Sequence, residues 1–75
     1  MYQLTITAEH NADVLYHALK PEEVTTDRAQ TSIDRQGDSV CVTIRARDAT
    51  ALKALTQSMI KLIETAEKIQ NGKRN

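Results

Sequence analysis

Apolar and polar residues alternate in three segments of the chain, the pattern of half-buried β-strands. The first segment covers residues 2–9, where every second residue is apolar: Tyr2, Leu4, Ile6 and Ala8. A more polar strand is expected over residues 28–35. The strongest pattern lies over residues 39–47, with Val40, Val42, Ile44 and Ala46 on one side. Gly37, in the sequence RQGDS, predicts a hairpin turn between the last two strands.

Two further segments have apolar residues every three or four positions, which predicts helices. The first follows Asn11, a candidate N-cap, and ends at Pro21; residues 22–27 are a polar connection. The second follows Asp48, whose carboxylate suits a helix N-terminus, and it ends in a frayed basic tail at 70–75. Its apolar seam consists of Leu52, Leu55, Met59, Leu62, Ala66 and Ile69, and Ile60 and Ile63 widen it.

The element order is therefore β-α-β-β-α, a single α+β domain over residues 1–75. The third strand is the most apolar, so we expect it at the centre of a three-stranded antiparallel sheet of order 1-3-2. Both helices then cover one face of the sheet. The other face is polar, with Gln3, Thr5, Thr7, Ser32, Thr43 and Arg45.

The long helix offers more apolar surface than this small sheet and one short helix can bury, which predicts a partner. A domain of this length buries only about 60% of its unfolded surface, and the single cysteine, Cys41, excludes an internal disulfide. Oligomerisation is the expected reinforcement. The candidate dimer or partner contacts are Leu15, Tyr16, Leu19, Leu52, Leu55, Met59, Leu62, Ile63 and Ala66. The alternative, that the whole stripe belongs to the chain's own core, stays open.

Charge and composition narrow the classes of function. Ten basic and ten acidic residues give no net charge, and the only aromatic residues are Tyr2 and Tyr16, which disfavours a base-stacking RNA-binding module. Arg28, Arg45 and Arg47 are candidate RNA phosphate contacts at one end of the sheet, with ordinary surface charge as the alternative. No apolar run approaches the ~20 residues of a membrane span, and the N-terminus lacks signal-peptide features. We expect a cytoplasmic protein without membrane contact.

Catalytic and metal-binding motifs are not found. His10, His17 and Cys41 have no metal-ligand spacing, and no glycine-rich phosphate loop occurs. The sequence therefore predicts no enzyme activity, no metal and no cofactor.

Three pieces of the sequence together form a family pattern. The first piece contains Ala12, Tyr16, Ala18, Leu19, Pro21 and Glu22. The second is Asp27-Arg28 before a strand, followed by Gly37. The third contains Ile44, Ala46, Arg47, Asp48, Ala51, Leu52, Lys53 and Ala54. In this order and at these separations, the three pieces resemble the Pcc family, the small dimerising subunit of the KEOPS (EKC) complex of archaea and eukaryotes. Two departures are Gln57-Ser58-Met59, where members often have Asn-Ser and an aromatic residue, and Lys53 in place of the usual Arg.

This resemblance implies a non-catalytic adaptor. It would form a homodimer, or a heterodimer with a paralogue, and dock through helices on the KEOPS transferase, which links it to the kinase-like ATPase. It would support threonylcarbamoyladenosine modification of tRNA, with indirect or weak contact to the tRNA itself. The alternatives are a paralogous Pcc-like regulatory subunit, a free-standing small RNA-binding module and a small ligand-binding regulatory domain.

Overall fold

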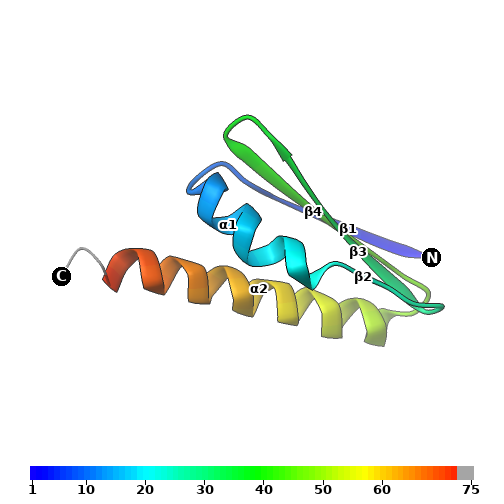
Figure 1. Ribbon diagram of the computed structural model, residues 1–75. Coiled ribbons are helices and arrows are strands. Elements are labelled where there is room, and N and C mark those ends of the chain that lie inside the picture. Colours follow the sequence, from blue (N-terminus) through cyan, green and yellow to red (C-terminus); the bar gives the residue numbers. More distant parts are fainter. Residues whose placement is uncertain (73–75) are drawn as a thin grey trace.

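The structure, a computed structural model, describes residues 1–72, with side chains up to Lys68. The elements are β1 (Tyr2–Ala8), α1 (Ala12–Leu19), a 3₁₀ turn η1 (Lys20–Glu22), β2 (Val24–Thr25), β3 (Ala29–Gln36), β4 (Ser39–Ala46) and α2 (Ala49–Gly72). Both helices lie on the same face of the sheet, as expected (Figure 1). The frayed tail predicted over 70–75 begins inside α2, and its residues 73–75 lie outside the described residues.

The sheet has four strands in the order β1-β4-β3-β2. The predicted arrangement 1-3-2 is present as β1-β4-β3, with β4 antiparallel to both neighbours. The prediction of three strands is wrong because β2 lies in the segment expected to be a polar connection. Two residues are too few to show a period of two, so the alternation cannot reveal such a strand.

A tight turn at Thr26 brings β2 against β3. The Thr26 hydroxyl accepts hydrogen bonds from the main-chain N–H groups of Arg28 and Ala29, at 3.2 and 3.1 Å. The main-chain N–H of Thr26 donates to the carbonyl of Ala29 at 2.8 Å. Local bonds of this kind are how threonine favours turns. The turn folds Val24 and Thr25 back alongside β3.

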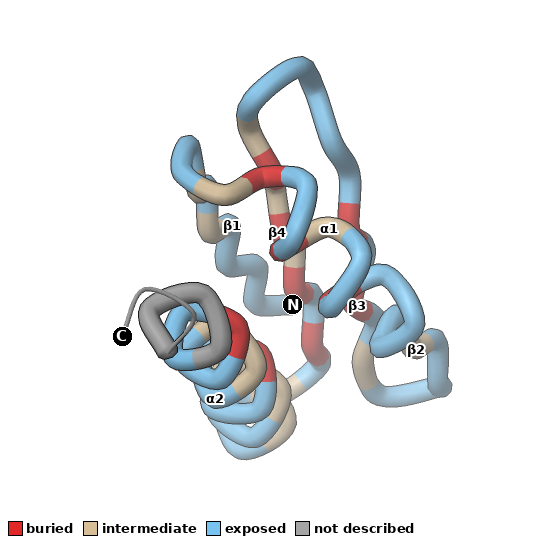
Figure 2. Tube along the Cα trace, turned by 60° about the vertical axis from the view of Figure 1, so that its left-hand side comes forward, coloured by how far each residue is buried: buried red, intermediate tan, exposed pale blue. Residues whose placement is uncertain are grey.

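The core lies between β4 and the two helices, and β4 alternates between buried and more exposed residues, as a central strand should (Figure 2). α2 packs over β4 and the β1 side, and α1 over β3 and β4. The buried cluster consists of Ala12, Leu15, Leu19, Ile33, Val40, Val42, Ile44, Met59 and Ala66. No helix in the described part of the chain is both long and apolar enough to cross a bilayer.

The two helices begin in different ways. Asp48 caps α2 as predicted, because its carboxylate accepts a hydrogen bond from the N–H of Ala51 at 2.8 Å. This bond, together with the nearby Arg28, lowers the pKa of Asp48. Asn11 makes no side-chain cap, which corrects the expectation for α1. It adopts a left-handed conformation with φ 55°, and its carbonyl accepts from the N–H of Leu15 at 2.9 Å.

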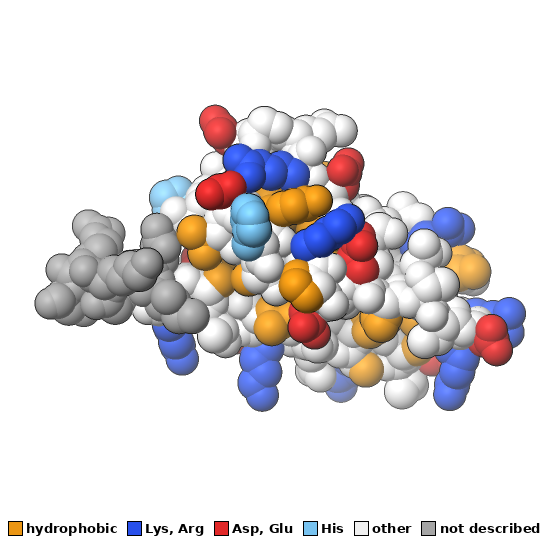
Figure 3. All heavy atoms as spheres, viewed as in Figure 1, with side chains coloured by type: hydrophobic (Ala, Val, Ile, Leu, Met, Phe, Trp, Pro, Cys, Tyr) orange, Lys and Arg blue, Asp and Glu red, His pale blue; other side chains and the backbone are white. Residues whose placement is uncertain are grey.

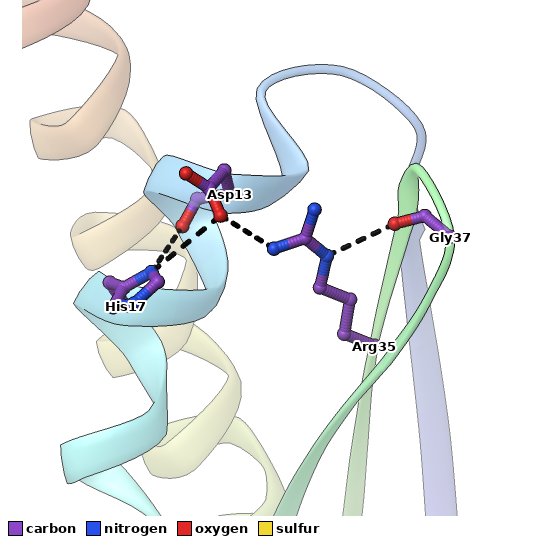
Figure 4. Close-up of polar contacts among 4 residues, drawn as sticks. All are labelled: Asp13, His17, Arg35 and Gly37. Atoms are coloured by element: carbon purple, nitrogen blue, oxygen red, sulfur yellow. Dashed lines mark hydrogen bonds and ion pairs between the residues drawn. The ribbon is translucent and has the colours of Figure 1, made fainter.

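An ion pair joins α1 to the β3–β4 hairpin (Figure 4). Arg35 donates to the Asp13 carboxylate at 2.6 Å and to the carbonyl of Gly37 at 3.0 Å. His17 Nδ1 lies 2.8 Å from the Asp13 carbonyl oxygen. The hydrogen bond and charge of Arg35 lower the pKa of Asp13. Gly37 itself has φ +60°, the conformation for which glycine suits this turn.

Candidate functional site

β1 forms an open edge of the sheet. It pairs with β4 on one side, and within residues 1–72 no strand pairs with its other side. Its sequence, YQLTITA, has no charged residue and no proline over seven residues. Proteins usually protect an edge strand with charges, proline, bulges or a short length. β1 therefore has a free row of main-chain donors and acceptors suited to pairing with another strand.

Apolar side chains lie beside this edge on the helix-facing side. Leu4 is opposite the fully buried Ile44, yet 36% of Leu4 is exposed, and Tyr2 is 49% exposed. On α2, Ile63 lines a small hollow together with Ala8 of β1. Ile60 precedes Ile63 by three residues, so it lies on the same side of the helix, and it is 45% exposed.

We name these residues the β1 strip: the exposed Tyr2, Leu4 and Ile60, with the half-buried Ile6 and Ile63. The strip runs along the border between β1 and α2, which lie on the same side of the molecule in Figure 2. Several exposed apolar side chains beside an open strand edge favour an interface, because apolar surface residues scattered singly need no such explanation.

The opposite edge of the sheet is formed by β2, which is only two residues long, and a very short edge strand is one of the usual protections against pairing. Beyond the short β2, the Glu23 carboxylate accepts a hydrogen bond from the N–H of Ile33 at 2.7 Å. The Lys20 ammonium donates to the carbonyl of the same residue at 3.3 Å and pairs with Glu23 at 3.1 Å. We call this the Lys20–Glu23 clasp. The bond from Ile33, and then Lys20, lowers the pKa of Glu23, and Glu23 raises the pKa of Lys20.

The predicted partner contacts divide into two groups. Four of them are buried in the chain's own core: Leu15, Leu19, Met59 and Ala66. Their burial favours the alternative that this part of the apolar stripe packs within the chain and does not contact a partner. The remaining five are half-buried around the core: Tyr16, Leu52, Leu55, Leu62 and Ile63. Apart from Met1, the most exposed large apolar residues are Tyr2, Leu4, Val14 and Ile60, and none of these was among the predicted partner contacts, although periodicity placed Ile60 at the margin of the seam. Only the edge position of β1 could have indicated the first two.

A second apolar surface lies between the helices. Hydrophobic side chains are visible between α1 and α2 in Figure 3, and lysine or arginine side chains project along the lower border. Leu62 lines a hollow of about 280 Å³ together with Ser58, Lys61 and Thr65 of α2 and Glu22 of η1. Leu62 is half-buried in this hollow, and Tyr16 of α1 is half-buried against the same core. We name the surface between α1 and α2 that contains these two residues the helix groove.

The three candidate arginines come together, as their positions at the ends of β3 and β4 predicted. Arg28, Arg45 and Arg47 line one hollow of about 230 Å³, which we name the arginine hollow. Its other lining residues are Met1, Thr26, Asp27, Ala29 and Gln30. Arg28 is paired with Asp48 at 3.2 Å.

The histidines and the cysteine lie apart. His17 bonds to the main chain of its own helix, and the half-buried Cys41 lies 3.5 Å from the hydroxyl of Thr7 on the outer face of the sheet. Across the described residues, no group of three or more His, Cys, Asp or Glu side chains could hold a metal ion.

Comparison with known proteins identifies the family. A family model described as transcription factor Pcc1 matches residues 2–71, nearly the whole chain. Pcc1 is a family of KEOPS subunits and not a known catalytic family. No curated protein matches the chain. The extent of the family match, together with the α+β fold, shows that this chain belongs to the Pcc1 family.

Proposed function

We propose that this chain is a non-catalytic adaptor subunit of the KEOPS complex, which dimerises through β1 and docks on the transferase subunit through its helices. One observation carries the proposal: the sheet has one long unprotected edge, β1, bordered by the β1 strip, and one edge protected by the shortness of β2 and by the Lys20–Glu23 clasp. An open edge on one side only favours a closed dimer over an extended polymer.

The geometry of such a dimer follows from the sheet. Two antiparallel β1 strands joined in one continuous sheet are related by a twofold axis perpendicular to it. That operation keeps the helices of both copies on the same face. It brings the β1 strips of the two copies together across the axis, so that Tyr2, Leu4 and Ile60 become covered. Burial of these side chains adds the hydrophobic stabilisation that a two-stranded contact alone lacks.

The helix groove remains free in this dimer and is the proposed docking surface for the transferase. Its half-buried Tyr16 and Leu62 are the proposed anchors, together with Leu52 and Leu55 nearer the start of α2. Through the transferase, the subunit would be linked to the kinase-like ATPase. In this reading it works in the cytoplasm and supports threonylcarbamoyladenosine modification of tRNA, by holding proteins together and without a catalytic residue of its own.

The dimer is tested by the change Leu4→Lys. An inward-pointing charge at a strand edge disfavours pairing, and Leu4 is exposed enough for the ammonium to reach water in the monomer. Light scattering should give a dimer mass for the wild type and a monomer mass for Leu4→Lys. The matched control is Ala18→Lys, because Ala18 is also apolar and exposed but lies on α1, outside the strip and outside the hollow that Ile63 and Ala8 line. A dimer that survives Leu4→Lys would remove β1 from the interface.

Docking is tested separately by co-purification with the transferase. Leu62→Asp should abolish the mixed complex, while Leu4→Lys should reduce its mass without abolishing it. A paralogue that pairs with this chain would use the same open edge. A mixed dimer formed when that paralogue is added would therefore show that the chain works as a heterodimer with the paralogue.

A further inference from the structure

The arginine hollow lies at the end of the sheet where β4 leads into α2. Arg45 alternates with the buried Ile44 and Ala46, so it points to the face away from the helices. Its cross-strand neighbours are the amide side chains Gln3 and Gln30. No residue of the described chain forms an ion pair with Arg45, whose guanidinium is therefore available to a ligand.

Like charges are brought together at this point. The N–H of Arg47 donates to the carbonyl of Arg28 at 2.9 Å, which places the two arginines side by side. Arg28 is neutralised by Asp48, and Arg47 has no ion pair within residues 1–72. Arg45 and Arg47 therefore face only one further lining carboxylate, that of Asp27. Adjacent like charges destabilise a sheet, and an anion relieves the repulsion.

We propose that the arginine hollow binds a phosphate group. Guanidinium groups donate two parallel hydrogen bonds to phosphate and favour planar, bidentate recognition. The guanidinium groups of Arg45 and Arg47, at the C-terminal end of β4, supply these paired hydrogen bonds. The side-chain amide of Gln30 adds a neutral donor. A phosphate carries several acceptor oxygens, so it can contact groups from β3 and β4 at once, whereas a single carboxylate has only two oxygens.

Two sources could supply this phosphate: the backbone of an RNA strand, or the phosphates of a free nucleotide. Beyond the hollow, the outer face of the sheet continues with the hydroxyl row Thr5, Thr43 and Ser32, which places no carboxylate beside the next stretch of a backbone. The inference does not depend on the dimer proposed above, because every lining residue belongs to one copy.

The test titrates the full chain with two probes, inorganic pyrophosphate and a short oligouridylate, and follows the arginine Nε–Hε signals by NMR. Arg45→Gln and Arg47→Gln each remove one positive charge. Lys68→Gln removes the same charge from an exposed position on α2 and is the matched control. Saturable binding of at least one probe should weaken by about tenfold in each arginine variant, since hydrogen bonds between charged groups are lost. It should stay unchanged in Lys68→Gln.

The two probes separate the sources. An RNA backbone is identified if the oligouridylate binds and its binding constant falls as salt is added. The slope of the logarithm of that constant against the logarithm of the salt concentration should then decrease in magnitude by about one for each arginine removed. Saturable binding of pyrophosphate with no gain from the longer probe identifies a free nucleotide. The proposal is overturned if neither probe binds saturably, or if Lys68→Gln weakens binding as much as the arginine variants do. Light scattering on the same samples reports the dimer independently, so a failure of one proposal is distinguishable from a failure of the other.

Discussion

The carboxylate of Glu23 accepts a hydrogen bond from the main-chain N–H of Ile33 at 2.7 Å, in the place where a longer β2 would have continued the ladder. A side chain thus replaces a strand at this edge. Lys20 completes the replacement by donating to the carbonyl of Ile33 at 3.3 Å. The donor and the acceptor of one edge residue are therefore both occupied without any partner chain.

Removing the clasp should open the second edge. In Glu23→Ala, the N–H of Ile33 loses its acceptor and Lys20 loses its ion pair. With both edges open, association can continue beyond two copies. Sedimentation velocity at increasing concentration should show larger species for Glu23→Ala, while Glu23→Gln, which keeps an acceptor oxygen, should remain dimeric. A Glu23→Ala sample that never exceeds the dimer would contradict the role given to the clasp.

Stability should fall in acid. The pKa values of Asp13, Glu23 and Asp48 are lowered in the folded chain, by Arg35, by Ile33 N–H and by Ala51 N–H respectively. Each of these carboxyl groups has a lower pKa in the folded chain than in the unfolded chain. It therefore stabilises the fold in full when the pH is above the pKa of the unfolded chain, and this stabilisation is lost as the pH falls through the pKa of the folded chain. The ordinary values are 3.8 for aspartate and 4.5 for glutamate.

The loss should therefore begin as the pH drops below 4.5 and continue below 3.8. Urea unfolding at a series of pH values measures it, and the double variant Asp13→Asn, Asp48→Asn should flatten the curve. Lys20 has a raised pKa, so its contribution is present at neutral pH and is lost only above its ordinary value of 10.5. A curve with the same acid slope in the double variant would mean that other groups cause it.

Met59 and Ile60 are neighbours in sequence with opposite roles. Met59 is buried in the core, whereas Ile60 belongs to the β1 strip. Met59→Ala should cost about 2–5 kcal/mol of unfolding free energy, because it leaves a cavity. Ile60→Ala should change the stability of the Leu4→Lys monomer by roughly 0.5 kcal/mol or less, as surface changes do. In the otherwise unaltered chain it should weaken the dimer. Denaturant unfolding and dilution followed by light scattering distinguish the two effects.

The hairpin turn depends on Gly37. Its φ of +60° disfavours any residue with a Cβ, although no atom lies within 4 Å of where that Cβ would be. Gly37→Ala should therefore destabilise the chain by about 1 kcal/mol through backbone strain alone. Gly37→Asn should cost less, because asparagine tolerates the left-handed region. Equal stabilities of the two variants in urea would show that the turn relaxes to another conformation.

Local patterns predicted much of this structure. The alternation over 39–47 identified the central strand, and the positions of Arg45, Arg47 and Arg28 at strand ends predicted that they meet. The pattern could not reveal β2, because two residues show no period and the strand depends on the Thr26 turn.

The candidate interface was harder to predict. The seam of α2 contains Met59 and Ala66 together with half-buried residues, and periodicity indicates a face without showing how much of it the chain's own core covers. Likewise, alternation places Tyr2 and Leu4 on the helix side of β1, but their exposure follows from the edge position of the strand and the limited reach of α2.

Hydrogen exchange of the β1 amides tests the central claim most directly. In a dimer joined through β1, the amides that point away from β4 donate to the second copy and should exchange slowly in the wild type. The same amides should exchange rapidly in Leu4→Lys, while those bonded to β4 stay protected in both. Rapid exchange of the outward amides in a wild-type sample whose scattering mass is that of a dimer would contradict the account, because the copies would then associate through another surface.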